Sequence, residues 1–542
     1  MAIATEQVAS KGSISREEVL VITASSVGTV FEWYDFYLYA TLAPFFAALF
    51  FPKGNATAAL LSAFAAYAAG FLVRPFGALV FGRIGDIIGR KYTFLVTIMV
   101  MGFSTFLVGL LPKFEVIGWA APVLLVSLRL LQGLALGGEY GGAATYVAEH
   151  SGHTRRGYNT SWIQTTATVG FFLALVVIYL CRTQMPGGKF SDWGWRIPFW
   201  VSLALLAFSV YIRLKLQESP VFQKIKAEGK TSKAPLTDAF LRYPNNKYAL
   251  LALLGATAGQ GVVWYTGQFY ALFFIQITLK LDYTITYLLI AASLVLGTPF
   301  FIFFGWLSDK IGRLKIILAG CLIAAITYFP LFHGLTHYVN PALEEFSART
   351  PISVTVDEAT CQFHLFVGPW STFSDCDKAR DFMTKQGLSF TSAAGAAGSA
   401  PVVKIGATEI NGYNEAAMKD ALKAQGYPDK ADPSKVNYVM TLLILFVFLI
   451  YVTMVYGPIA AFLVELFPTR IRYTSMSLPY HIGNGWFGGM LPLTATAVVA
   501  LYGNIYAGLW YPVLVSVMTV VIGAIFLRET KERDITTYEH ES

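Results

Sequence analysis

A ten-residue pattern occurs twice in this chain of 542 residues. Gly82, Asp86, Gly89 and Arg90 of the first copy return as Gly305, Asp309, Gly312 and Arg313, each 223 positions later. Both copies are short charged turns between long apolar segments. The repeat therefore predicts two related halves, in each of which membrane helices are joined in the same order.

The composition predicts that lipid is the main solvent of this chain. Hydrophobic residues make up 55% of the sequence and charged residues 13%, a balance too apolar for a surface that faces water. A helix needs about 20 mostly apolar residues to cross a bilayer. Such stretches lie near 20–50, 57–82, 92–112, 117–147, 160–181, 195–214, 248–277, 284–305, 314–335, 437–463, 474–501 and 507–527. We expect an all-α integral membrane protein with twelve transmembrane helices in two six-helix pseudo-repeats.

The short connections between these stretches predict the orientation. Cations gather after the even-numbered helices, at Arg83, Arg90, Lys91, Arg155, Arg156, Lys310, Arg313, Lys315, Arg470, Arg472, Arg528, Lys531 and Arg533. The turns after the odd-numbered helices hold few cations, mainly Lys53, Lys113 and Lys280. Loops rich in Lys and Arg stay in the cytoplasm. We therefore expect a multi-pass protein of the bacterial inner membrane with both termini inside, whose net charge of +7 reflects topology and not binding of nucleic acid.

Two polar stretches interrupt the helices and predict the domain boundaries. The expected parts are a tail (1–19), a six-helix bundle (20–216), a cytoplasmic linker (217–247), helices seven to nine (248–337), an extracytoplasmic insert (338–436), helices ten to twelve (437–528) and a second tail (529–542). Within the insert, helical spacing at 377–386 and 414–425, alternation at 401–410 and small residues at 392–400 predict a small α+β module with a linker.

Two of the four cysteines, Cys361 and Cys376, lie in the insert. An extracytoplasmic location favours a disulfide between them, and two buried free thiols are the alternative. We expect no metal site, because His364 is the only nearby histidine and the chain has no Cys-x-x-Cys pair. The chain also has no Walker-type phosphate loop. We therefore expect no cofactor, and a proton gradient as the energy source.

Ionisable groups inside the predicted helices indicate where chemistry takes place, because a charge at membrane depth is costly unless it is paired. Glu32 and Asp35 share one helix face, and Arg129 and Arg74 are the cations expected to pair with them across helices. With Glu139, three acids face two arginines, so one acid should hold a proton. Glu32, Asp35, Arg129 and Glu139 are the expected proton-coupling residues. The alternative is a permanent salt-bridge network that only joins the helices.

Neutral polar side chains of helices seven and eleven are suited to hydrogen-bond a polar solute. Together with groups of the first half they give the expected substrate-binding set: Arg74, Arg129, Gln132, Gln164, Trp264, Tyr265, Gln268 and His481. For any single member, core packing is the alternative interpretation.

The repeated turn resembles the signature turn of the major facilitator superfamily. Further matches are Phe31-Glu-Trp-Tyr-Asp-Phe36, Arg74-Pro75, Arg129-Leu-Leu-Gln-Gly133, Gly137-Gly-Glu-Tyr-Gly-Gly142, Gly194-Trp-Arg-Ile-Pro-Phe199, Glu218-Ser-Pro-Val-Phe222 and Glu465-Leu-Phe-Pro-Thr-Arg-Ile-Arg-Tyr-Thr474. In combination they are similar to the metabolite:proton symporters. The resemblance implies that Gly82, Asp86, Gly89 and Arg90, with Gly305, Asp309, Gly312 and Arg313, form the gating motif.

The resemblance also implies proton-coupled import of a small metabolite by alternating access, commonly a carboxylate and sometimes a zwitterion such as proline or betaine. Arg74 and Arg129 favour an organic anion, and the short tail after Arg528 argues against an osmolyte carrier. We also consider an efflux antiporter and, from a different class of protein, a membrane nutrient sensor that uses the insert. We expect a monomer that is not an enzyme, with no catalytic residues, whose partners are a small-molecule substrate, protons and the lipid bilayer.

Overall fold

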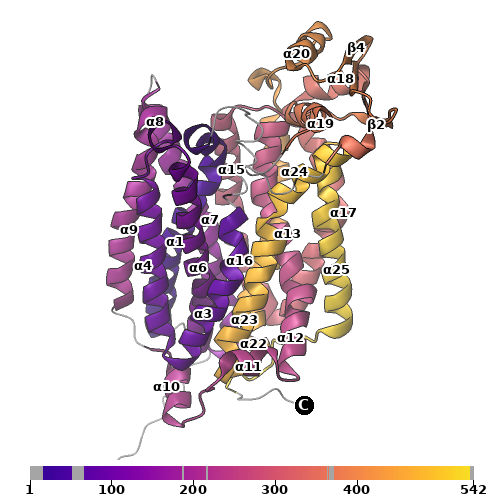
Figure 1. The fold of residues 1–542 in the computed structure, drawn as a ribbon. Helices are drawn as coiled ribbons and strands as arrows, with labels where there is room; N and C mark the ends of the chain where they lie inside the picture. Colours follow the sequence, from indigo (N-terminus) through magenta and orange to yellow (C-terminus); the bar gives the residue numbers. More distant parts are fainter. Residues whose placement is uncertain are drawn as a thin grey trace, which may run out of the picture.

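The computed structural model describes residues 16–51, 66, 68–185, 188–214, 218–362, 364 and 372–536. Within this part of the chain, eleven helices are long and apolar enough to cross a membrane. A further 35-residue helix, α1 (Arg16–Phe50), packs beside them. Figure 1 shows two helical bundles side by side, the first half of the chain in indigo and purple and the second in pink to yellow.

The first bundle follows the predicted order of apolar stretches. Its helices are α1, α3 (Arg74–Ile87), α4 (Arg90–Val108), α6 (Ala120–Glu149), α7 (Arg156–Gln184) and α9 (Ile197–Leu214), with the short α5 (Phe114–Ile117) and α8 (Lys189–Asp192) in the connections. The helix expected near 57–82 lies partly outside the described residues, and its described part runs over 68–87. Within the described residues the first helix runs over Arg16–Phe50, and so includes residues before the predicted start at 20.

The connection between the bundles is partly helical. It contains α10 (Pro220–Ala227) and α11 (Pro235–Phe240). Each begins with proline, which has no N–H to leave unsatisfied in a first helical turn.

Within the described residues, the second bundle is built from eleven helical segments. They are α12 (Asn245–Ala252), α13 (Ala258–Tyr265), α14 (Ala271–Phe273), α15 (Tyr283–Gly297), α16 (Pro299–Ile311), α17 (Arg313–Val339), α21 (Tyr438–Tyr456), α22 (Ile459–Leu466), α23 (Arg472–His481), α24 (Leu491–Tyr502) and α25 (Trp510–Phe526). Helix seven runs over Asn245–Thr278. Its segments α12, α13 and α14 are each followed by a π-helical segment, at Leu253–Thr257, Thr266–Tyr270 and Phe274–Thr278. Helix eleven joins α23 to α24 through a π-helical segment at Ile482–Gly489. Such segments often mark functional positions, and these two helices carry the expected neutral polar ligands.

The insert is a four-stranded sheet with three helices. Its elements are α18 (Pro341–Arg349), β1 (Ile352–Val356), α19 (Asp375–Lys385), β2 (Thr391–Ala394), β3 (Val402–Ile405), β4 (Thr408–Asn411) and α20 (Glu415–Ala424), and the strand order is β2-β1-β3-β4. β1 pairs with β2 in parallel and with β3 antiparallel. The linker expected at 392–400 is therefore wrong in part, because β2 forms there through its main chain although its side chains are exposed.

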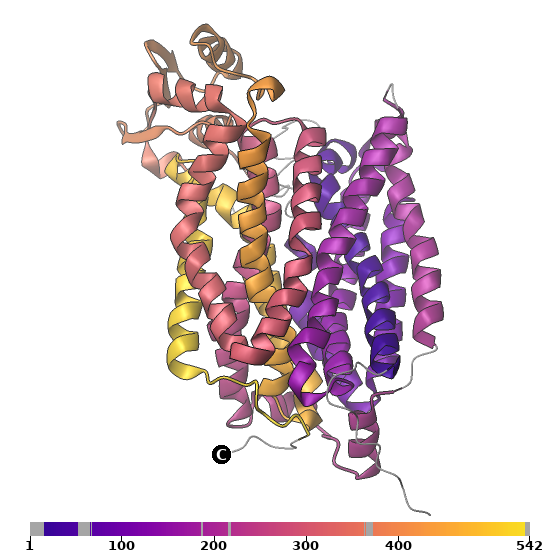
Figure 2. The ribbon, with the colours of Figure 1, turned by 180° about the vertical axis from the view of Figure 1, so that it is seen from behind.

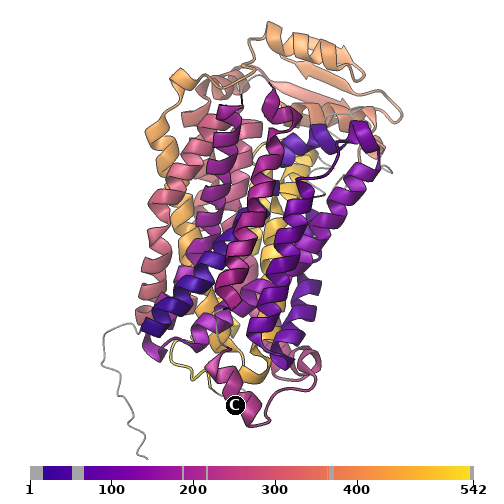
Figure 3. The same cartoon turned by 90° about the vertical axis from the view of Figure 1, so that its left-hand side faces the viewer.

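Figure 1 shows the insert above one end of the second bundle, and Figure 2 shows the same arrangement from behind. In Figure 3, turned by 90°, the insert again lies at this end of the helices. We call this end of the molecule the insert end. The opposite end carries the repeated turns and α10 and α11, and we call it the turn end.

Candidate functional site

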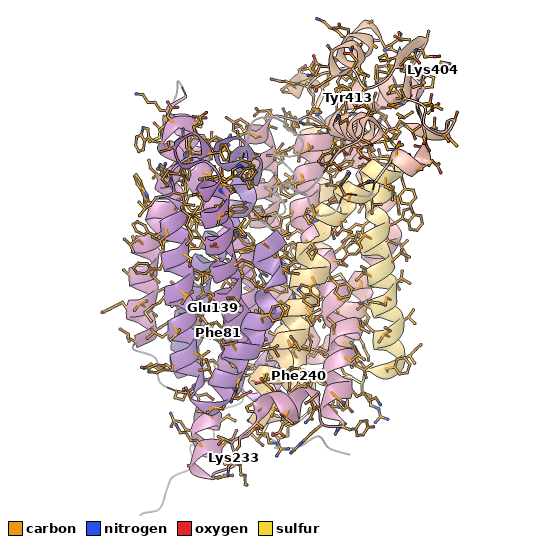
Figure 4. All side chains as sticks on the ribbon, in the orientation of Figure 1. Phe81, Glu139, Lys233, Phe240, Lys404 and Tyr413 are labelled. Carbon is orange, nitrogen blue, oxygen red and sulfur yellow. A yellow bond between two sulfur atoms is a disulfide. The ribbon has the colours of Figure 1, made fainter. Side chains whose placement is uncertain are left out.

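A buried charge cluster in the first bundle is centred on Arg213 of α9. Its guanidinium binds Glu32 of α1, and it donates to Oε1 of Glu139 of α6 at 2.8 Å. None of the three side chains is more than 2% exposed. The guanidinium also lies 3.7 Å from the ring centre of Phe94. Figure 4 labels Glu139, which lies within the first bundle. Two carboxyl groups thus share one guanidinium.

This arrangement corrects the expected pairing. We predicted that Glu32 and Asp35 pair with Arg74 or Arg129, but Glu32 instead binds Arg213. Asp35 is 4% exposed and makes no ion pair within the described residues. The sequence-based count of two buried arginines missed Arg213 because it is one residue from the end of α9, where a cation is ordinarily assigned to the membrane surface. The sequence feature that could have indicated the burial of Arg213 is that this residue directly continues an apolar stretch.

Asp35 and Arg129 are connected through neutral groups. Arg129 Nη1 donates to Gln132 Oε1 at 2.6 Å, and Gln132 Nε2 donates to Thr105 Oγ1 at 2.9 Å. The hydroxyl groups of Thr105 and Ser202 lie next to the Asp35 carboxylate. Arg129 also lies over the Tyr39 ring, 4.4 Å from its centre. Arg129, Gln132 and Thr105 therefore form a hydrogen-bonded chain that ends beside Asp35.

Arg74 occupies the boundary between the two bundles. It is 1% exposed, and its guanidinium lies 4.1 Å from the ring centre of Phe71 and 4.4 Å from that of Phe36. Within the described part of the chain, its Nε and Nη2 have no hydrogen-bond partner. Its charge acts on Tyr265 and His481 of the second bundle. A buried cation with unused donors is the feature of this region that most directly indicates an anionic ligand.

Several of the other expected ligands also have unused polar atoms. Both ring nitrogens of His481, both amide atoms of Gln268 and Nε1 of Trp264 are buried, with no hydrogen-bond partner among the residues described. Gln164 differs, because its Nε2 donates to the Tyr140 hydroxyl at 2.6 Å. Such groups are costly unless a ligand or water satisfies them.

Aromatic rings from both bundles surround this polar region. Trp264 lies 6.1 Å from Trp33 and 6.0 Å from Tyr37, measured between ring centres. Tyr140 stacks on Tyr480 with ring centres 3.5 Å apart. Trp264, and the Tyr140 hydroxyl that accepts from Gln164, therefore lie among aromatic rings where the two halves touch.

At the turn end, each repeated turn binds a helix of the other bundle. Asp86 Oδ2 accepts hydrogen bonds from the backbone N–H of Thr474 at 2.9 Å and from its hydroxyl at 2.7 Å. Asp309 accepts from the backbone N–H groups of Gly157 and Tyr158 at 2.9 and 2.8 Å. Both carboxylates therefore cap the first turn of a helix, where negative charge is favourable. Gly82 and Gly305 allow the close approach, since a Cβ there would press on Thr474 and Ser161.

Buried ion pairs reinforce this contact between the halves. Glu465 accepts from Arg156 at 2.8 Å and from Arg313 at 3.1 Å, and Arg313 also binds Asp309 at 2.8 Å. Glu149 of the first bundle binds Arg472 of the second at 3.1 Å. Arg156, Arg313 and Arg472, which were used to predict the topology, are therefore engaged in buried pairs.

The glycines that end the two turns have matching roles. Gly89 has φ 144° and Gly312 has φ 117°, a region that favours glycine. At each position a Cβ would collide with a carboxylate, that of Glu218 at Gly89 and that of Glu529 at Gly312. These carboxylates accept from the N–H groups that open α4 and α17. The side chain of Arg90 lies outside the described residues.

Cys361 and Cys376 form a disulfide in the insert, with Cα atoms 5.4 Å apart. Within the described residues, no group of three or more His, Cys, Asp and Glu side chains has the arrangement of a metal site.

Comparisons with known proteins agree with this architecture. A family model described as "Sugar (and other) transporter" matches residues 20–247 and 421–541, which is more than half of the chain, and one described as "MFS/sugar transport protein" matches residues 144–356. The solved structure of the proton:xylose symporter XylE bound to 6-bromo-6-deoxy-D-glucose has a TM-score of 0.65 at 15% identity, and the match covers 96% of this chain and 98% of that one. This likeness concerns the fold alone.

Curated relatives are similar in sequence. The shikimate transporter of Escherichia coli K12 is 36% identical over 57% of this chain and 71% of its own length, and the alpha-ketoglutarate permease of the same organism is 34% identical over 61% and 74%. A putative proline/betaine transporter of Staphylococcus aureus is 37% identical over 59% and 69%. These matches are to transporters and not to enzymes. The chain belongs to the sugar (and other) transporter family of the major facilitator superfamily.

Proposed function

We propose that this membrane transporter imports a small organic anion, a carboxylate metabolite, together with protons by alternating access. The observation that carries the proposal is Arg74, a buried guanidinium at the boundary between the halves whose Nε and Nη2 donors are unused within the described residues. An unneutralised charge at this depth is costly. A carboxylate substrate would neutralise it and could take two parallel hydrogen bonds.

The surroundings of Arg74 support this ligand class. Tyr265 and His481 approach it from the second bundle, so an anion bound there would contact both halves. Elsewhere in helix seven, Gln268 and Trp264 also have buried polar atoms without a hydrogen-bond partner among the described residues. The relatives named for shikimate and alpha-ketoglutarate carry carboxylates, which agrees with the proposal.

We propose Glu32 and Glu139 as the proton-coupling pair, with Asp35 and Arg129 as a connected second site. When both carboxyls of the pair are ionised, the cluster with Arg213 has one uncompensated negative charge, which one proton would remove. The two carboxyl groups lie next to each other, so that they can share it. The coupling requires that the bundles, as they rock, change the access of water to this pair.

For the arrangement in the membrane, we propose twelve spanning helices in a bacterial inner membrane, with the turn end in the cytoplasm and the insert outside. The Cys361–Cys376 disulfide fits an oxidising exterior. Contacts of Asp86 and Asp309 across the halves close the turn end, so the state described here would be closed to the cytoplasm. The transporter would act as a monomer and need no cofactor.

A zwitterion such as proline or betaine is the second candidate, because the Staphylococcus aureus relative carries that name. A carboxylate on Arg74 is common to both substrates. A quaternary ammonium group would then face the aromatic rings of Trp33 and Trp264.

The test is uptake of radiolabelled shikimate, alpha-ketoglutarate and glycine betaine into proteoliposomes with an alkaline interior. We expect one of the acids to accumulate, a collapsed pH gradient to stop accumulation, and Arg74→Gln to lower uptake by about a hundredfold or more, since an ionic contact is lost. Arg528→Gln, an exposed cation beyond the last helix, is the matched control and should transport normally. Uptake that ignores both the pH gradient and Arg74→Gln would refute the proposal, and accumulation of betaine alone would establish the second candidate.

A further inference from the structure

A cavity of about 110 Å³ lies where the insert meets the ends of helices seven and eleven. Phe273 and Phe274 of helix seven form one wall, Ala500 and Leu501 of α24 form another, and Asp381 with other residues of α19 closes it from the insert. Its size is close to that of cavities that hold a benzene ring, about 150 Å³. Phe273 is five residues beyond Gln268, so the cavity lies about 8 Å along the helix from the proposed transport site.

The walls of this cavity are fixed to one another by hydrogen bonds. Lys280, just beyond helix seven, donates to the carbonyl of Lys385 at the end of α19. Phe390 N–H donates to the Gly503 carbonyl, just beyond α24, at 2.7 Å. The insert thus holds the ends of both helices in position, and the cavity is formed before any ligand enters.

The two acids of α19 in this cavity differ in their partners. Asp377 accepts from the backbone N–H of Gln362 at 2.8 Å, from that of Ser374 at 2.9 Å and from His364 Nε2 at 3.1 Å. Asp381 lies one helical turn further and is half-buried, and within the described residues it has no hydrogen bond and no ion pair. A half-buried carboxylate without donors favours a ligand that supplies one.

We propose that this cavity is an accessory site for a small amine with an aromatic or branched apolar body. The ammonium group binds Asp381, and the apolar body packs on Phe273, Phe274 and Leu501. Aromatic walls favour a cation over a neutral or anionic end group. Two cations, Arg380 and Lys385, also line the cavity. Arg380 Nη2 donates to Ser392 Oγ at 2.8 Å, and its Nε has no hydrogen-bond partner within the described residues. The site is separate from Arg74 and does not depend on the proposed substrate.

The charge of Asp381 agrees with this assignment. Burial and the neighbouring Asp377 carboxylate raise the pKa of Asp381 to about 6, while His364 and Lys385 act in the opposite direction. The carboxylate is therefore ionised at neutral pH and can bind an ammonium group, and it takes up a proton at mildly acidic pH.

Binding to the purified full-length protein at pH 7.5 tests the proposal with three probes of one shape: 2-phenylethylamine, 2-phenylethanol and 3-phenylpropionate. We expect calorimetry to show binding of the amine, and binding at least tenfold weaker for the alcohol and the acid. Asp381→Asn should weaken amine binding at least tenfold, whereas Asp420→Asn, an exposed acid of α20, should leave it unchanged.

Two further variants separate loss of the site from other effects. Ala500→Trp fills the cavity from the membrane side and should also abolish amine binding, with the insert untouched. Arg74→Gln should bind the amine normally, so failure of the transport proposal would leave this one standing. Equal binding of the alcohol or the acid, or full amine binding to Asp381→Asn, would overturn the proposal.

Discussion

Arg213 is the residue whose removal should damage the first bundle most. Arg213→Ala would leave Glu32 and Glu139 facing each other without their shared cation, and breaking a buried ion pair costs about 3–5 kcal/mol. We expect a clear drop in the thermal unfolding temperature of the detergent-purified protein. Glu139→Gln should cost much less, because it removes the uncompensated negative charge and leaves Glu32 paired. An Arg213→Ala variant as stable as the wild type would show that the cluster does not hold the bundle together.

The sequence indicated which ionisable groups are buried better than it indicated their partners. Glu32, Glu139, Arg74 and His481 were found because ionisable groups inside apolar helices are rare and costly. Their pairing could not be found, since it depends on how helices one, four and six rotate against one another, which apolar spacing leaves open. A cation near a helix end, such as Arg213, shows its burial only once the neighbouring helices are in place.

At the scale of elements, the long apolar helices could be predicted from the sequence, whereas the π-helical interruptions and the exposed strand β2 could not. β1 and β2 show why, because their pairing joins segments about 40 residues apart and rests on main-chain hydrogen bonds. The π-helical segments of helices seven and eleven likewise have no sequence pattern of their own. Gln268 lies within one of these segments and His481 directly precedes another, although the sequence alone indicated only that both are polar.

Helix α19 should make the stability of the protein depend on pH. The pKa of Asp381 is about 6 in the folded insert against an ordinary value of 3.8, so the folded state binds more protons than the unfolded state between these values. Stability should therefore rise as the pH falls from 7.5 to 5. Asp381→Asn should raise stability at pH 7.5 by about 1–3 kcal/mol and flatten this dependence.

The measurement is the unfolding temperature of the full chain at pH 5 and 7.5, for wild type and Asp381→Asn. The difference between the two pH dependences isolates Asp381, because other titrating groups contribute equally to both proteins. If the unfolding temperature changed equally with pH in the two proteins, the raised pKa of Asp381 would be contradicted. Asp420→Asn serves as the control and should follow the wild type.

At the scale of the whole molecule, each half binds the other through the equivalent aspartate of its repeated turn. Asp86 of the first half caps helix eleven, and Asp309 of the second caps helix five, α7. If the halves move as rigid bodies, both caps stabilise the same closed interface between the halves. If single helices move, each cap protects only its own helix.

Cysteine accessibility distinguishes these cases. Ser477 of α23 is fully buried against Gly141 of the other half, so a cysteine there, in a Cys181→Ser/Cys321→Ser background, should react slowly with a water-soluble maleimide. Asp86→Asn and Asp309→Asn should each speed the reaction about tenfold or more, because charge-assisted hydrogen bonds worth about 1.5–3 kcal/mol are lost. The exposed neighbour Lys310→Gln is the control.

The double variant decides between the two kinds of motion. In rigid-body motion one opening breaks both caps, so each substitution lowers the free energy of that opening and the two effects on the labelling of Ser477 should add. If single helices move, Asp86→Asn should speed the labelling of Ser477 and the distant Asp309→Asn should not, so the double variant should react like Asp86→Asn alone. Because the repeat places the two aspartates in equivalent positions of one interface, we expect the rigid-body result, which makes the paired turns a single gate for the whole transporter.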